Sequence, residues 1–139
     1  MAVVFSTADL IWTCRNKRKI RAWLEQVIAA HGFETGEIEL IFCSDTYLLE
    51  LNTKALQHAY YTDIITFDYC AGELVSGDLF VSLDRVKDNA RSHKVSFSTE
   101  LHRVLVHGVL HLCGWTDATE AEKHAMRAEE NRWLSSFPS

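Results

Sequence analysis

Hydrophobic and polar positions change their period several times along the chain, and these changes divide it into helices and strands. Apolar residues recur every three to four positions in the segments expected to be helical. That spacing predicts helices over residues 16–31, 45–56 and 83–93, followed by two C-terminal helices. Runs rich in β-branched and aromatic residues predict strands over residues 2–6, 37–44, 62–70 and 76–83. The segment AGELVSG favours a hairpin between the last two strands.

The last two helices carry recognisable start and stop signals. Ser96 can cap the first of them, and Gly114 is a natural terminator after its apolar run. Thr119 with Glu122 matches a capping box that starts the final helix, which ends near residues 133–134. Strands and helices therefore alternate first and helices collect at the end. This order predicts an α+β fold with one mixed, mainly parallel sheet of about four strands packed with helices.

The composition is that of a globular chain. Its 139 residues suit a single domain covering positions 1–139, and a hydrophobic content of 47% is enough for a core. The N-terminus lacks a basic region and cleavage site, and no apolar run approaches the ~18 residues that span a bilayer. We therefore expect a cytoplasmic protein without membrane contact. The four cysteines form no C-x-x-C pair and are expected to stay thiols.

The net charge of −5 argues weakly against nucleic acid as a partner, but the cations are unevenly distributed. The segment CRNKRKIR holds five of them without an acid. This basic cluster consists of Arg15, Lys17, Arg18, Lys19 and Arg21. It is either the solvated start of a helix or a patch that contacts phosphates.

Two histidines interrupt the apolar run of the penultimate helix, in the segment HGVLHLCGWTD. His107 and His111 are four residues apart, so they project from one helix face and can share a metal ion. The alternative is a pair of core histidines bonded to carbonyls or a carboxylate, and the i, i+4 spacing favours the metal. A turn after Gly114 can fold Asp117 back toward them, with His124 as a rival third ligand. Two imidazoles and a carboxylate suit one zinc ion per chain, with a fourth position open.

Gly108 stands where a zinc peptidase of the H-E-x-x-H type has its general-base glutamate. A peptidase function is therefore disfavoured. A glycine inside a helix costs about 1 kcal/mol relative to alanine, so its presence indicates close approach of backbone or substrate.

The histidine segment resembles the signature H-G-x-L-H-L-x-G-[YW]-x-[HD] of the YbeY family of bacterial metal-dependent endoribonucleases. The segments LNTKALQHAYYTDIITFDY, GDLFVSLDRV and ELHRVLVHG are similar to further blocks of that family, in the same order. The resemblance implies a zincin-like fold with zinc held by His107, His111 and Asp117, the last replacing the usual histidine. It also implies cleavage of single-stranded RNA, a role in 16S rRNA 3′ end maturation and ribosome quality control, and ribosomal RNA or ribosomal proteins as partners.

After Asp117, a second departure from the family pattern concerns an arginine. The family's arginine, four residues after the L-N asparagine, falls on Leu56. His58 and the basic cluster are unranked candidates to replace its contact with phosphate. Leu56 also supports the alternative function, a non-catalytic ribosome-assembly or RNA-binding factor that metal merely stabilises.

Each of three other residues has two possible roles, one structural and one functional. Asp63 and Asp78 are expected to be structural, and each is alternatively a carboxylate that orients a histidine ligand. Trp115 is expected to pack beneath the ligand loop, with base stacking in an RNA groove as the alternative.

Overall fold

The computed structural model describes residues 2–56 and 62–138, and it confirms each predicted element with small shifts of boundary. The elements follow in the order β1 (Ala2–Thr7), α1 (Lys17–Ala30), β2 (Glu34–Cys43), α2 (Asp45–Leu56), β3 (Ile64–Asp68), β4 (Leu74–Ser82), α3 (Leu83–His93), α4 (Phe97–Leu112) and α5 (Glu120–Ser135). Among the described residues, no helix is both long and apolar enough to cross a membrane.

The four strands form one sheet in the order β1-β2-β4-β3. The β1–β2 and β2–β4 pairs are parallel, and β3 runs antiparallel to β4. The predicted hairpin is present: Ala71 and Leu74 exchange backbone hydrogen bonds around Gly72, whose φ of 60° suits glycine. The expected α+β architecture with a mixed, mainly parallel sheet is thus confirmed.

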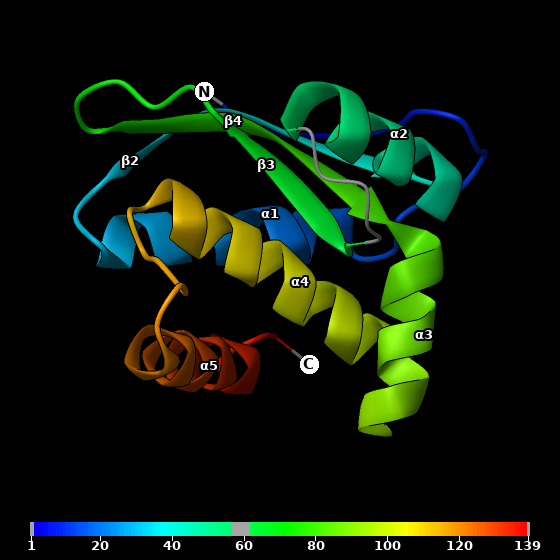
Figure 1. The fold of residues 1–139 in the computed structure, drawn as a ribbon. Helices are drawn as coiled ribbons and strands as arrows, with labels where there is room; N and C mark the ends of the chain where they lie inside the picture. Colours follow the sequence, from blue (N-terminus) through cyan, green and yellow to red (C-terminus); the bar gives the residue numbers. More distant parts are fainter. Residues whose placement is uncertain (1, 57–61, 139) are drawn as a thin grey trace.

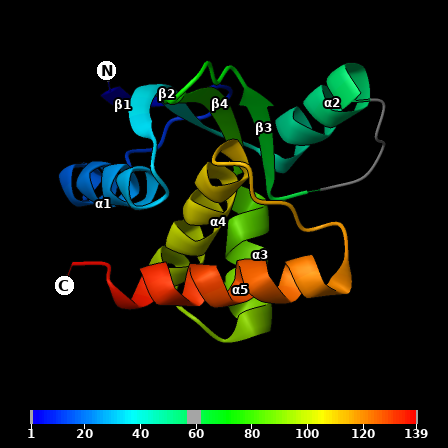
Figure 2. The same cartoon turned by 90° about the vertical axis from the view of Figure 1, so that its left-hand side faces the viewer.

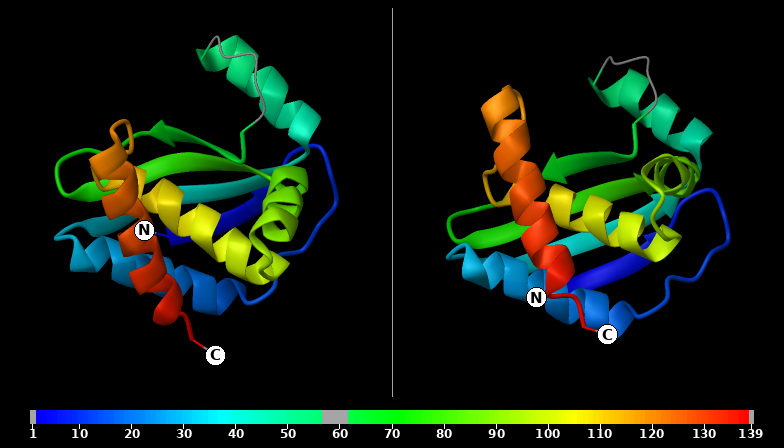
Figure 3. Two further views of the ribbon diagram at one scale, coloured as in Figure 1. Left: turned by 60° about the horizontal axis from the view of Figure 1, so that its bottom comes forward. Right: turned by 90° about the horizontal axis from the view of Figure 1, so that it is seen from below.

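Helices cover the two faces of the sheet unequally. Figure 1 shows α1 and α4 beneath the sheet and α2 above it, with α5 on the side of α4 that faces away from the sheet. Figure 2 shows α2 standing apart from the other helices. In Figure 3, α5 crosses α4 on the side that faces away from the sheet. The C-terminus, which follows α5, lies beside α1. Helix α4 is therefore enclosed by the sheet, α1, α3 and α5, which explains its almost continuous apolar sequence.

Gly108 is the point at which α4 lies closest to the sheet. A Cβ atom added there would stand 2.7 Å from Cδ1 of Ile64 on β3 and 2.7 Å from Cδ2 of Leu79 on β4. Both distances are shorter than any ordinary carbon contact. The glycine expected to mark a close approach of the backbone therefore allows α4 to pack directly on the sheet.

Candidate metal centre

His107 and His111 lie on the face of α4 that the sheet leaves uncovered. Their side chains are 26% and 28% exposed, so they are half-buried rather than enclosed in the core. They continue a polar stripe that begins with Glu100 and Arg103 on the same face, at the three- and four-residue spacing of a helix. The two Nε2 atoms are 3.1 Å apart.

The loop that carries Asp117 is fixed at both ends by helix-terminal hydrogen bonds. At the end of α4, Gly114 (φ 98°) and the following residue form a Schellman motif: the Gly114 amide donates to the His111 carbonyl and the Trp115 amide to the Leu110 carbonyl. At the start of α5, the predicted capping box between Thr119 and Glu122 is present. Only three residues, 116–118, separate the two motifs, so the chain must turn back across the histidines.

This turn brings the Asp117 carboxylate to both imidazoles. Its Oδ2 atom is 3.4 Å from Nε2 of His107 and 3.5 Å from Nε2 of His111. Ligand atoms about 2.0–2.1 Å from a tetrahedral zinc ion lie about 3.3 Å from one another. The three measured separations are close to that value, so the residues present fit one zinc ion bound to two nitrogens and an oxygen.

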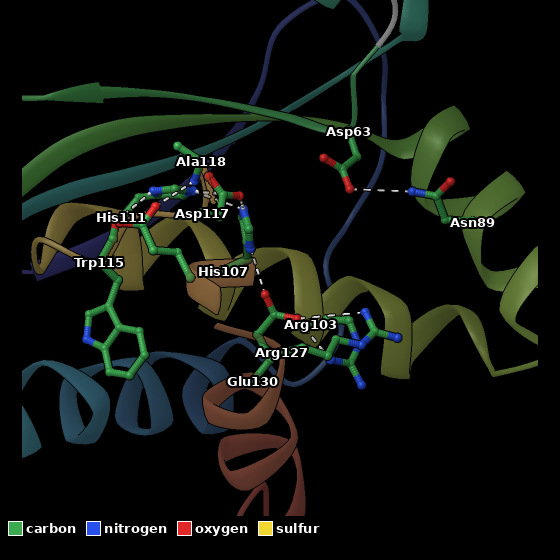
Figure 4. Close-up of polar contacts among 11 residues, drawn as sticks. Asp63, Asn89, Arg103, His107, His111, Trp115, Asp117, Ala118, Arg127 and Glu130 are labelled. Carbon is green, nitrogen blue, oxygen red and sulfur yellow. Dashed lines mark hydrogen bonds and ion pairs between the residues drawn. The ribbon is translucent and has the colours of Figure 1, made fainter. Parts of the chain in front are cut away.

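The second nitrogen of each ring supports the same conclusion. Nδ1 of His107 contacts Oε2 of Glu130 at 2.6 Å, and Nδ1 of His111 contacts the Trp115 carbonyl oxygen at 3.0 Å (Figure 4). Both partners are acceptors, so each Nδ1 carries the proton and each neutral ring presents a lone pair at Nε2. Two lone pairs and a carboxylate oxygen that face one another repel unless a cation or a proton lies between them.

Glu130 is a candidate site residue that the sequence analysis did not predict. It is 4% exposed, and its other oxygen accepts a 2.9 Å hydrogen bond from Nη1 of Arg103. Burial alone raises the pKa of this carboxyl, but the bonds from His107 and Arg103 outweigh it, so the pKa lies below its ordinary value. Glu130 shares the apolar stripe of α5 with Met126 and Trp133, and an acid on such a stripe was the available signal.

Glu130 also acts on the ligand that it holds. Burial lowers the pKa of His107, but the hydrogen bond and charge of Glu130, with the charge of Asp117, raise it above the ordinary value overall. The same negative groups that favour a proton on this ring also favour a metal cation beside it. Proton and metal therefore compete for one site.

Neither predicted supporting carboxylate is bonded to a histidine. Asp63 lies beside the pair in Figure 4, but its Oδ2 atom accepts from Nδ2 of Asn89 at 3.4 Å, and burial raises its pKa. Asp78 points away from α4, because its neighbours Gly77 and Leu79 are the residues of β4 that face this helix. Its carboxylate instead accepts from the Tyr69 hydroxyl. Alternation along β4 decided the outcome for Asp78, whereas Asp63 precedes β3 and is held by a local partner.

The other candidate residues are scattered. His124 is exposed on α5 and is not in the ligand cluster, so the structure does not support it as the third ligand. Trp115 packs partly buried against the core with its ring edge-on to His31, which supports its packing role. His58 lies outside the described residues.

The basic cluster lies at the start of α1, far from the histidines. The other end of α1 is nearer to them, since His31 lies edge-on to the ring of Trp115, whose carbonyl oxygen contacts Nδ1 of His111. The 14 residues of this helix span about 20 Å. Arg21 is partly engaged in the fold, because its Nε donates to the Val3 carbonyl at 2.9 Å. The cluster therefore does not adjoin the candidate metal centre.

Comparison with known proteins identifies the family. The family model described as endoribonuclease YbeY matches residues 7–138. The endoribonuclease YbeY of Bacteroides thetaiotaomicron is 47% identical over 135 residues, covering 97% of this chain and 98% of that protein. That of Phocaeicola vulgatus is 51% identical over 120 residues, covering 86% and 87%. This chain belongs to the YbeY endoribonuclease family. The resemblance inferred from its motifs is confirmed.

A solved structure has a similar fold. A Thermotoga maritima protein determined in solution superposes with a TM-score of 0.68 at 22% identity, over 97% of this chain and 88% of that one. At that identity the likeness concerns the fold alone.

Proposed function

We propose that this chain, as one domain over residues 1–139, is a zinc-dependent endoribonuclease that cleaves single-stranded RNA. The observation that carries the proposal is the convergence of His107, His111 and Asp117 within 4.8 Å, with both Nδ1 atoms held by acceptors. Bound there, zinc would supply a Lewis acid for a phosphodiester and make water more acidic. The protein's own groups hold the ligand rings in one tautomer and one orientation.

The family membership extends the proposal to the biological substrate. We propose 16S rRNA as the substrate, with 3′ end maturation and ribosome quality control as the role, on ribosomes in the cytoplasm. The YbeY relatives are named endoribonucleases, which supports RNA as the substrate class. The alternative is a metal-stabilised ribosome-assembly or RNA-binding factor without catalysis, and Leu56 favours it because the family's arginine is absent there.

An RNA cleavage assay with two matched histidine variants tests the proposal. His111→Ala should lose both zinc and cleavage of a single-stranded RNA, because two protein ligands remain. His124→Ala should keep both, since His124 is exposed on α5 and outside the ligand cluster. Wild-type protein that binds zinc and RNA but does not cleave would establish the non-catalytic alternative. Full zinc content in a His107→Ala, His111→Ala double variant would refute the metal centre itself.

A further inference from the structure

The proposed nuclease needs cations that hold the RNA backbone beside the metal centre. At position 56, where the family has arginine, this chain has leucine at the end of α2. The basic cluster lies at the opposite end of α1 from the residues that approach the histidines. Neither the resemblance nor the charge pattern of the sequence therefore identifies a phosphate contact near the cleavage site.

A cavity of about 260 Å³ opens directly beside the candidate ligands, because His107 and Asp117 form part of its wall. Helix α5 contributes two cations to this wall, Lys123 and Arg127, and α4 contributes Arg103. None of the five members of the basic cluster belongs to the described lining. Figure 4 shows Arg127 and Arg103 near Glu130, below His107.

The three cationic side chains of the cavity wall differ in exposure and in their hydrogen bonds to other residues of the protein. Arg103 is 15% exposed and donates to Glu130 at 2.9 Å and to Oδ1 of Asn131 at 2.7 Å. Its guanidinium is therefore occupied in holding α5 against α4. Its charge also balances that of Glu130. The same wall carries three further carboxylates, those of Asp63, Glu100 and Asp117, the last a candidate metal ligand.

Lys123 and Arg127 have accessible charged ends. They are 59% and 52% exposed, and as residues four apart they lie on one face of α5. The nearest acid to Lys123 is Glu120, 3.6 Å away and itself 94% exposed, an arrangement that contributes little energy. Arg127 is 3.9 Å from Glu130, whose oxygens already accept the shorter bonds from His107 and Arg103.

We propose that Arg127 and Lys123 of α5 bind the backbone phosphates of single-stranded RNA next to the bond that is cleaved. This inference rests on the proposed function and names residues that hold its substrate. Arg127 is the stronger contact, because a guanidinium can donate two parallel hydrogen bonds to one phosphate. A strand held by both residues passes along the cavity wall toward His107 and Asp117.

Binding of a single-stranded 2′-O-methyl RNA to zinc-loaded protein tests the assignment separately from cleavage. Arg127→Ala should weaken binding about tenfold, and each lost phosphate contact should lower the salt slope of log affinity by about 0.7. Arg132→Ala is the matched control: Arg132 is also on α5 and 65% exposed, but it pairs with Glu129 and is absent from the described cavity wall. It should change affinity less than twofold.

Further variants separate a phosphate contact from a structural role. Arg127→Lys should keep the salt slope while it loses part of the affinity, and Lys123→Ala should add its own decrease of slope to that of Arg127→Ala. All variants should retain wild-type zinc content, because neither residue contacts a ligand. Affinity and salt slope of the Lys123→Ala, Arg127→Ala protein equal to those of Arg132→Ala would overturn the inference, while wild-type cleavage would leave the proposed function standing. Wild-type protein that neither binds nor cleaves RNA would overturn both.

Discussion

Replacing Glu130 by glutamine tests whether this buried carboxylate supports the metal centre. The carboxylate accepts two hydrogen bonds at once, from Nδ1 of His107 at 2.6 Å and from Nη1 of Arg103 at 2.9 Å. Glutamine has the same shape but only one oxygen, and its other terminal atom is a donor. In Glu130→Gln, one of the two partners must therefore face an NH₂ group in a site that is 4% exposed.

The structure sets the expected size of the effect. A buried donor that loses its acceptor costs about 1–3 kcal/mol. If His107 loses it, the ring is no longer held and zinc affinity falls about 10- to 100-fold, the usual effect of removing such a partner. If Arg103 loses it, the same cost reduces the free energy of unfolding. We expect the two losses together to reach at least about 1 kcal/mol, since no side-chain rotation satisfies both donors.

Zinc affinity measured by competition with a chelator, together with urea unfolding, gives both quantities. Glu129→Gln is the control, because Glu129 is also on α5 and is only 12% exposed. Like Glu130, it contacts a histidine and a second donor: His31 at 3.1 Å and Nε1 of Trp133 at 2.8 Å. It does not contact a candidate ligand. Glu130→Gln protein with the zinc affinity of Glu129→Gln protein would show that Glu130 is only part of the α4–α5 packing.

Two further predictions concern Asp117 and His102. Asp117→Ala should weaken zinc retention in dialysis, because only two protein ligands remain. Asp117→His should retain zinc, because imidazole and carboxylate both bind it. Equal zinc content in Asp117→Ala and wild-type protein would remove Asp117 from the site. Burial lowers the pKa of His102 to about 4, so the folded protein favours its neutral form. The contribution of this residue to the free energy of unfolding is therefore complete above the unfolded pKa of about 6.5, and it is lost as the pH falls toward 4. His102→Phe keeps a ring stacked on Phe137. It should reduce the difference in unfolding free energy between pH 7.5 and pH 4.5 by about 2–3 kcal/mol. An unchanged difference would show that His102 is not the group responsible.

The local signals of this sequence determine its secondary structure. Hydrophobic period separates strands from helices, and the caps at Ser96 and Thr119 fix where α4 and α5 begin. These features depend on residues within a few positions of one another, so they can be read without the fold. The spacing of His107 and His111 is equally local, because four residues in a helix place two side chains on one face.

The third candidate ligand is an intermediate case. Gly114 predicts the turn that follows α4, but the direction of the turn depends on where α5 begins, and therefore on the capping box of Thr119 and Glu122. Both signals are present in the sequence. Together they were sufficient to favour Asp117 over His124, and the geometry agrees with that choice.

Only the tertiary structure decided which carboxylate supports the centre and which cations adjoin it. Asp78 lies in a segment that resembles a block of the family, yet the alternation of β4 turns it away from α4. Glu130, 23 residues from His107 in the chain, contacts it across a helix–helix interface. The cations show the same effect. The densest run of cations lies at the distant end of α1, whereas Lys123 and Arg127, which are not part of a run, line the cavity. The physical reason is that periodicity assigns a side chain to one face of its own element, whereas its partners depend on how that element packs against others far away in the chain.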